Sequence, residues 1–169
     1  MMGLPDAEAL VTELVHKLKG RVTPQTAMVG IRTGGAWLAE RLHERLGVKV
    51  PLGTLDISFY RDDYNQAGLH ASLQPSQIPF DVNGCDILLV DDVLYTGRTT
   101  RAALNELFDY GRPKCVHLVV LVDRAEQQLP IAAQFVGATL TVPDGKILRL
   151  ARDDAGRLDF KLTDAKPAA

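Results

Sequence analysis

Two adjacent carboxylates and a glycine-containing turn stand close together in the middle of this 169-residue chain. Asp91 and Asp92 follow the apolar run 87–90, and the turn 96–99 (Thr-Gly-Arg-Thr) leads into an expected helix. Paired carboxylates accept hydrogen bonds from vicinal ribose hydroxyls or hold hydrated Mg²⁺. Backbone N–H groups at a helix start receive a phosphate. The segment predicts a sugar-phosphate site; the alternative is an acidic pair that merely ends a strand.

The spacing of apolar residues predicts the elements that carry this segment. Three helices are expected: from the cap Asp6 to Gly20, from the Gly-Gly breaker at 34–35 to Gly47, and from the turn 96–97 to Gly111. The third is expected to bury Ala103, Leu104, Leu107 and Phe108. Strands are expected over residues 27–31, 48–57, 87–90 and 116–122, the second of them interrupted near Pro51 and Gly53. Alternation of strands and helices indicates an α/β fold with a central parallel sheet flanked by helices. Ligands bind beyond the carboxyl ends of such strands, where Asp91 stands.

The remaining segments complete a single domain over residues 1–169. Residues 58–83 are polar and interrupted by prolines, which predicts a long flexible loop. Apolar stretches on both sides of the turn 153–156 predict a C-terminal hairpin over about 146–162.

Composition excludes several classes of function. A formal charge of −2 argues against a surface devoted to nucleic-acid phosphates, although one local basic face remains compatible with it. The two cysteines, Cys85 and Cys115, form no CxxC pair and are expected to be buried thiols rather than zinc ligands. Neither a signal segment nor a membrane-spanning run is evident, so we expect a cytoplasmic protein without membrane partners.

The thirteen residues 87–99 resemble the phosphoribosyl-diphosphate signature of the type I phosphoribosyltransferases. The version Val93-Leu94-Tyr95-Thr96-Gly97-Arg98-Thr99 is most similar to the pyrimidine operon regulators that double as uracil phosphoribosyltransferases, the PyrR family. Segments 56–63, 122–124, 129–131 and 135–137 extend the resemblance, which runs from about Thr12 to Gly137. It implies the type I phosphoribosyltransferase fold, with a small hood and a flexible catalytic loop at 56–63.

The resemblance also implies roles for individual residues. Asp91, Asp92 and Arg61 are the implied catalytic residues, with Mg²⁺ held through substrate diphosphate and water and with Asp91 and Asp92 as its candidate protein ligands. The implied phosphoribosyl-diphosphate and nucleotide contacts are Arg32, Thr33, Gly34, Gly35, Asp91, Asp92, Val93, Leu94, Tyr95, Thr96, Gly97, Arg98, Thr99, Arg124 and Val136. The family usually has an arginine where this chain has Gly34, and Arg61 or Arg124 is a hypothetical substitute.

The implied reaction converts uracil and phosphoribosyl diphosphate (PRPP) to uridine monophosphate (UMP) and diphosphate. One alternative is a purine-type phosphoribosyltransferase, and another is a nucleotide-sensing RNA-binding regulator with little catalysis. Thr12 and His16 resemble residues that the family uses against a pyrimidine-operon leader RNA in response to UMP or UTP, although a lone solvated histidine is the alternative. Gln127 and Ala132 are neutral where the family is commonly basic, which argues against that RNA activity. A homodimer or homotetramer is also implied.

Overall fold

The computed structural model describes residues 3–57 and 75–167. Their elements are, in chain order, α1 (Ala7–Leu18), β1 (Thr26–Ile31), α2 (Gly34–Leu46), β2 (Gly53–Leu55), β3 (Asp86–Leu94), α4 (Arg98–Asp109), β4 (Cys115–Asp123), β5 (Phe135–Thr139), β6 (Lys146–Arg152) and β7 (Leu158–Asp164). The first five strands form one parallel sheet in the order β2-β1-β3-β4-β5. The expected α/β fold with a central parallel sheet is thus confirmed. No helix among the described residues is long and apolar enough to cross a membrane.

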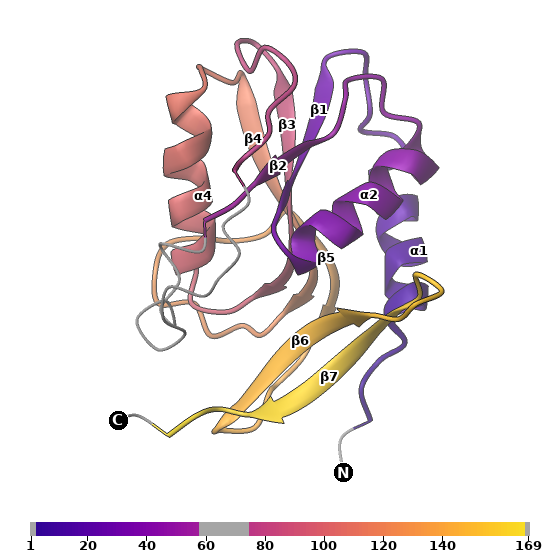
Figure 1. Ribbon diagram of the computed structural model, residues 1–169, viewed down its shortest axis with the longest axis vertical. Coiled ribbons are helices and arrows are strands. Elements are labelled where there is room, and N and C mark those ends of the chain that lie inside the picture. The colour runs from indigo at the N-terminus through magenta and orange to yellow at the C-terminus, as the bar shows by residue number, and fades with distance from the viewer. Residues whose placement is uncertain (1–2, 58–74, 168–169) are drawn as a thin grey trace.

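Helices cover both faces of the sheet (Figure 1). α1 and α2 pack on one face, where Leu14 and Leu42 join a buried cluster with Met28 and Val90. α4 packs on the other face, and its Leu107 joins a second cluster. α1 begins at the predicted cap, because the Asp6 carboxylate accepts hydrogen bonds from the N–H groups of the first turn.

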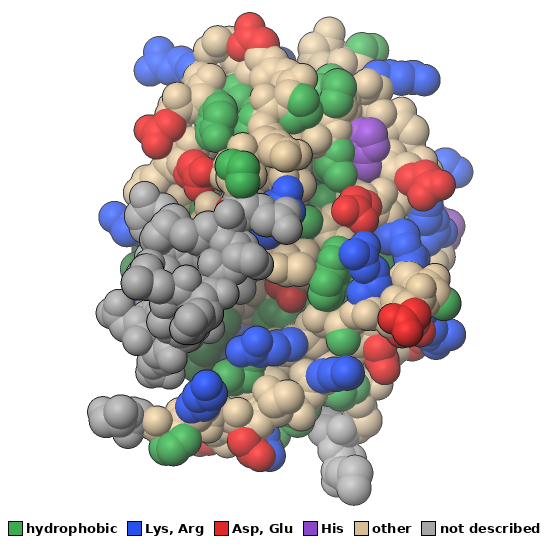
Figure 2. Space-filling view, in the orientation of Figure 1, with side chains coloured by type: hydrophobic (Ala, Val, Ile, Leu, Met, Phe, Trp, Pro, Cys, Tyr) green, Lys and Arg blue, Asp and Glu red, His purple; other side chains and the backbone are tan. Residues whose placement is uncertain are grey.

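The antiparallel hairpin of β6 and β7 lies apart from the main sheet and contacts α1, α2 and β3 (Figure 1). Leu148, Leu150, Leu158 and Phe160 point inward and complete the first buried cluster. Exposed cations gather along the hairpin in Figure 2. The hairpin also forms two ion pairs, Lys146 with Asp164 and Arg152 with Glu40.

One carboxylate ties the hairpin to the helices. Glu8 of α1 accepts hydrogen bonds from the Leu158 N–H at 2.7 Å and from Nη1 of Arg41 at 2.9 Å, and Arg41 also donates to the Gly156 carbonyl. Burial by itself would raise the pKa of Glu8, but the Leu158 N–H and the Arg41 and Arg157 guanidiniums outweigh it and hold this pKa below its usual 4.5. The ionised Glu8 carboxylate therefore holds the hairpin against α1 and α2.

Several elements differ from the sequence prediction. Only Gly53–Leu55 of the strand expected over 48–57 is a strand, since Pro51 has no N–H for the ladder and β2 lies at the sheet edge. Strand β5 was not predicted. Phe108 is 54% exposed rather than buried, because α4 buries the stripe of Thr100, Ala103 and Leu107.

The described part of the expected loop, residues 75–83, is packed rather than loose. Gln77 pairs with Thr54 through two backbone hydrogen bonds of 2.8 Å, and Val82 is buried. Both cysteines are half-buried rather than buried. Burial is the main cause that raises the pKa of each thiol. Nearby carboxylates raise these pKa values further, those of Asp81 and Asp86 for Cys85 and that of Asp86 for Cys115. Neither thiol is therefore poised as a nucleophile.

Candidate functional site

The acidic pair lies where the sheet opens between two of its strands. β1 pairs with β3 only as far as Gly30 opposite Val90, whereas β4 continues beside β3 to Asp123 opposite Leu94. Asp91 and Asp92 therefore belong to β3, which corrects the expectation that the strand ends at Val90. The longer neighbour β4 supplies the ladder that extends it.

The chain leaves β1 and β3 in opposite directions at this point. From β1 it continues through α2 to β2 at one edge of the sheet, and from β3 it continues through α4 to β4 on the other side. The gap between β1 and β3 is thus the switch point of the topology, where open α/β sheets bind ligands. α2 and α4 both start at this end of the sheet, on opposite faces.

Short hydrogen bonds hold the two carboxylates. Asp91 is 4% exposed, and its Oδ1 accepts the Asp92 N–H at 2.9 Å. Asp92 is half-buried, and its Oδ1 accepts the Val93 N–H at 2.9 Å. A carboxylate can accept several hydrogen bonds on its two oxygens. The pair can accept hydrogen bonds from adjacent hydroxyl groups or contact a metal ion.

The turn after β3 has the conformation expected of an anion cradle. Gly97 is the N-cap of α4 with φ of 96°, a left-handed conformation that favours glycine, and the N-cap residue itself makes no side-chain cap bond. The Arg98 N–H donates to Oγ1 of the buried Thr96 at 3.2 Å. A Cβ on Gly97 would lie 3.1 Å from Cβ of Ile131. N–H groups of this helix start, next to half-buried Thr99, suit a phosphate.

The loop before α2 forms a second helix start at the same end of the sheet. It contains a cis peptide between Arg32 and Thr33, and exposed Thr33 is the N-cap without a side-chain cap bond. Gly34 and Gly35 are buried, and a Cβ on Gly35 would lie 2.6 Å from the Val90 carbonyl oxygen. The loop thus packs directly against β3. Arg32 donates from Nη2 to Oγ1 of Thr54 at 3.2 Å, toward β2.

An arginine that follows β4 stacks on a tyrosine that follows β3. The Arg124 guanidinium lies 3.7 Å from the centre of the Tyr95 ring. Its Nε and Nη2 reach Oε2 of Glu126 at 2.9 and 2.8 Å, and its side chain is 7% exposed. The Tyr95 ring is more open, with the residue 46% exposed. Stacking and the ion pair therefore fix the plane and direction of this guanidinium.

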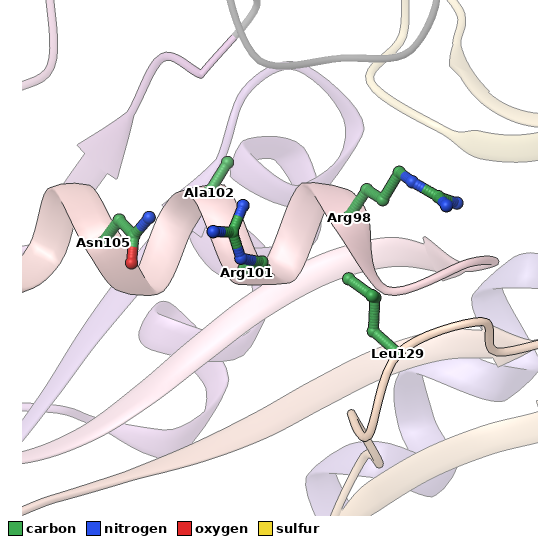
Figure 3. A pocket seen from close by; sticks show the side chains of 5 residues that line it. All are labelled: Arg98, Arg101, Ala102, Asn105 and Leu129. Atoms are coloured by element: carbon green, nitrogen blue, oxygen red, sulfur yellow. The ribbon is translucent and has the colours of Figure 1, made fainter.

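The segment after Arg124 wraps around the turn of α4. The N–H groups of Gln128 and Leu129 donate to the Thr96 carbonyl at 2.9 and 3.3 Å, and Arg98 donates to the Gln128 side chain. A hollow of about 290 Å³ lies beside the helix start and is lined by Arg98, Arg101, Ala102, Asn105 and Leu129 (Figure 3). Two guanidiniums, those of Arg98 and Arg101, therefore line this hollow beside the start of α4.

Sequence reasoning missed Glu126 and Gln128 as residues of this site. Neither Glu126 nor Gln128 stands in a periodic pattern; only their closeness to Arg124 in sequence marks them. The Leu94 side chain is buried in the core and its carbonyl accepts the Arg124 N–H at 3.0 Å, and its contact with a nucleotide stays a prediction. Val93 is half-buried beside the first cluster. Arg61 lies outside the described residues.

The residues expected on β5 and α1 lie beyond the acidic pair and its two helix starts. Val136 is half-buried at the edge strand β5, and its carbonyl accepts a hydrogen bond from Nζ of Lys17 at 2.7 Å. Thr12 is half-buried and accepts from Nη1 of Arg45 at 3.1 Å, while His16 is exposed. Both stand on α1, away from the turn of α4.

Magnesium fits this site only together with a ligand that brings oxygen atoms. Within the described ranges, no group of three or more His, Cys, Asp or Glu side chains is arranged to hold a metal ion. Asp91 and Asp92 supply carboxylate oxygens, which Mg²⁺ prefers, and Mg²⁺ is usually bound by one or two carboxylates plus substrate phosphates and water. The donor set is therefore that of a metal ion that arrives with a phosphorylated substrate.

Comparisons with known proteins agree with this arrangement. Residues 4–144 match the family described as Phosphoribosyl transferase domain. The chain is 49% identical over 154 residues to a protein of Pseudomonas fluorescens Pf-5 named Bifunctional protein PyrR, covering 89% of this chain and 92% of that protein. It is 51% identical over 151 residues to the protein of the same name from Pseudomonas savastanoi pv. phaseolicola, covering 86% and 89%.

Solved structures are similar in fold. A hypoxanthine-guanine phosphoribosyltransferase of Bacillus anthracis matches with a TM-score of 0.66 at 18% identity, covering 83% of this chain and 85% of that chain. A hypoxanthine phosphoribosyltransferase of Staphylococcus aureus matches with a TM-score of 0.62 at 22% identity, covering 82% and 74%. At these identities the similarity concerns the fold.

Proposed function

This chain belongs to the phosphoribosyltransferase family, and we propose that it transfers the phosphoribosyl group of PRPP to uracil, forming UMP and diphosphate with Mg²⁺. The single observation that carries the proposal is the acidic pair of β3 placed between the starts of α2 and α4, whose N-cap residues make no side-chain cap bond. PRPP has phosphate groups at both ends of its ribose. A sugar over Asp91 and Asp92 therefore brings one phosphate group to each helix start.

Each part of the site has a task in this reaction. The turn 96–99 holds the 5-phosphate through backbone N–H groups, and the loop 32–35 receives the diphosphate. Asp91 and Asp92 accept hydrogen bonds from the ribose hydroxyls and so orient the anomeric carbon. A bond forms between a uracil nitrogen and that carbon as the carbon's bond to the diphosphate oxygen breaks, and the proton of that nitrogen passes to solvent. Bound Mg²⁺ supplies positive charge for the leaving diphosphate.

Arg124 is proposed to recognise the base. Its Nε and Nη2 are engaged by Glu126, and its position beyond β4 lies next to the turn that holds the phosphate. A guanidinium only donates hydrogen bonds, so it suits the carbonyl oxygens of uracil. The resemblance of residues 93–99 to the PyrR signature supports uracil over a purine, and the purine-specific structures at 18% and 22% identity support the fold alone.

A panel of bases tests the proposal. The protein is incubated with PRPP, Mg²⁺ and either uracil, hypoxanthine or guanine, and nucleotide formation is measured. We expect UMP from uracil, strongly reduced turnover in Asp92→Asn, and unchanged turnover in the matched control Asp109→Asn, which lies at the exposed end of α4. Turnover of a purine but not of uracil would reject the base assignment. Unchanged kinetics of Asp92→Asn would reject the role of that carboxylate.

RNA binding is a separate activity that the relatives' designation as bifunctional makes worth testing. Gln127 is neutral, and its amide Nε2 donates to Oδ1 of Asp123 at 2.7 Å, while Ala132 is exposed and uncharged. These residues offer a polyanion no positive charge, so we propose transfer as the principal activity. Gel-shift titration against the leader of its own pyrimidine genes, with and without UMP, decides the matter. Saturable, UMP-dependent binding by a catalytically silent protein would favour a regulator instead.

A further inference from the structure

The turn that follows β4 brings Glu126 back onto Arg124. Ala125, which lies between them, has φ of 56°, a left-handed conformation that is uncommon for a residue with a side chain. The Asp123 carboxylate holds this turn, because its Oδ1 accepts the Ala125 N–H at 2.8 Å and Nε2 of Gln127 at 2.7 Å. Oε2 of Glu126 lies 2.9 Å from Nε and 2.8 Å from Nη2 of Arg124. The local backbone therefore supplies the guanidinium with a carboxylate partner.

Glu126 changes what the Arg124 guanidinium offers to a ligand. A guanidinium binds a carboxylate best along one edge, through two parallel hydrogen bonds. Arg124 is 8% exposed, and Glu126 already occupies its Nε–Nη2 edge. Neither contact uses Nη1, whose N–H groups suit a carbonyl oxygen. The segment 123–127 carries two carboxylates and one guanidinium, a formal charge of −1. A base beside Arg124 therefore meets hydrogen-bond donors in a segment without net positive charge.

We propose that Glu126 makes the base site select neutral pyrimidines and exclude pyrimidines that carry a carboxylate on the ring. The inference rests on the proposed function, because it concerns the base that Arg124 is proposed to recognise. Uracil bears no net charge at neutral pH and loses little beside Glu126. A ring carboxylate would bring a second negative charge to a guanidinium that Glu126 already neutralises, and Glu126 would repel it. Specificity then comes from an unfavourable contact with the wrong base.

Two pairs of nucleotides that differ in charge and not in shape measure this selectivity. They are UMP with a carboxylate at ring position 5 or at ring position 6, each compared with the neutral carboxamide at the same position. Calorimetry gives the affinity of each nucleotide and requires no turnover. The wild-type protein should bind each carboxamide more tightly than the matching carboxylate.

Glu126→Gln keeps the length of the side chain and removes its charge. It should reduce the preference for the carboxamide about tenfold in one or both pairs, the order for removal of one like charge at a partly hydrated site. The Glu126 side chain is 37% exposed, so its charge is partly screened by water. Glu44→Gln, an exposed change of equal charge near the far end of α2, should keep the wild-type preference. An unchanged preference of Glu126→Gln in both pairs would overturn the inference.

Glu126→Asp separates the effect of charge from the effect of a disturbed turn. Aspartate keeps the negative charge on a shorter side chain, so this variant should retain most of the preference for the carboxamides. Equal losses in Glu126→Asp and Glu126→Gln would show that the shape of the turn determines the selectivity, and the inference would fail. Thermal melts and the affinity for UMP establish that both variants are folded before the preferences are compared.

The outcomes separate this inference from the proposed function. If UMP is not formed from uracil but the nucleotide pairs bind as described, the transfer reaction fails and the inference stands. If UMP forms but Glu126→Gln keeps the wild-type preference, the function stands and the inference fails. If the wild-type protein binds neither UMP nor its four derivatives, the nucleotide site and the inference both fail.

Discussion

Replacing Glu8 with glutamine should loosen the C-terminal hairpin, and only at pH values where Glu8 is ionised. The Glu8 carboxylate accepts the Leu158 N–H at 2.7 Å and the two terminal nitrogens of Arg41 at 2.9 and 3.3 Å. Glutamine has the same shape and keeps one acceptor oxygen, but it loses the charge. The change therefore isolates the electrostatic part of the attachment between the hairpin, α1 and α2.

The expected loss of stability follows from the solvent exposure of the Glu8–Arg41 ion pair. A well-buried hydrogen bond to a charged group contributes about 1.5–3 kcal/mol, and an exposed ion pair contributes at most about 1 kcal/mol. The Arg41 and Glu8 side chains are 32% and 29% exposed. We therefore expect Glu8→Gln to lower the free energy of unfolding at pH 7 by about 1–2 kcal/mol.

The pH dependence has a definite direction. Because the pKa of Glu8 is lower in the folded protein than its usual 4.5, ionised Glu8 stabilises the fold fully above that value. This stabilisation is lost as the pH falls through the folded pKa, where Glu8 becomes protonated and resembles glutamine. The difference between wild type and variant should therefore shrink below about pH 4.5 and vanish in stronger acid.

Urea unfolding of both proteins at a series of pH values measures this difference. Glu13→Gln, an exposed change on the same helix, is the matched control and should alter stability little at any pH. Hydrogen exchange at the Leu158 amide reports on the hairpin itself and should accelerate in Glu8→Gln at neutral pH. A difference in unfolding free energy that persists unchanged in acid would refute the electrostatic argument.

Two further substitutions probe the crevice. Gly97→Ala places a side chain in a left-handed conformation 3.1 Å from Ile131. It should lower the free energy of unfolding by about 1–2 kcal/mol, measured by urea unfolding, and weaken UMP binding, measured by calorimetry. Wild-type UMP affinity would argue against a phosphate at this turn. Tyr95→Leu removes the ring that covers Arg124 and should raise the KM for uracil about fivefold, the order of a partly buried cation–π contact. The control Tyr95→Phe should keep the wild-type KM. Equal KM values for the two variants would exclude a positioning role for the ring.

The sequence predicts well those features that depend on neighbouring residues. The turn 96–99 was identifiable because Gly97 and the helix after it are adjacent in the chain, and the structure has glycine there with positive φ. α2 ends at Gly47, as predicted, because its left-handed conformation lets the N–H bond back to His43 and Glu44. Local conformational preference determines both features.

Contacts between distant residues were not predictable in the same way. Tyr95 and Arg124 stack because β3 and β4 end side by side, and no periodic pattern records that proximity. The edge strand β5 was missed because it is short and only its first residue is buried. Gly34 was noted only as a departure from a family arginine, and its contact with Asp92 emerges from the pairing of β1 with β3.

The position of the contact between Gly34 and Asp92 explains why one end of the sheet suits a substrate with phosphates at both ends. Parallel strands bring the starts of the following helices to the same end of the sheet, and a reversal of strand order places those helices on opposite faces. Here the reversal lies between β1 and β3, so the starts of α2 and α4 face one gap with Asp91 and Asp92 between them. A substrate with a single phosphate would engage only one helix start. The site as a whole therefore favours a sugar that carries phosphate groups on both sides. If the strand order did not reverse between β1 and β3, the two helix starts would be separated from the acidic pair.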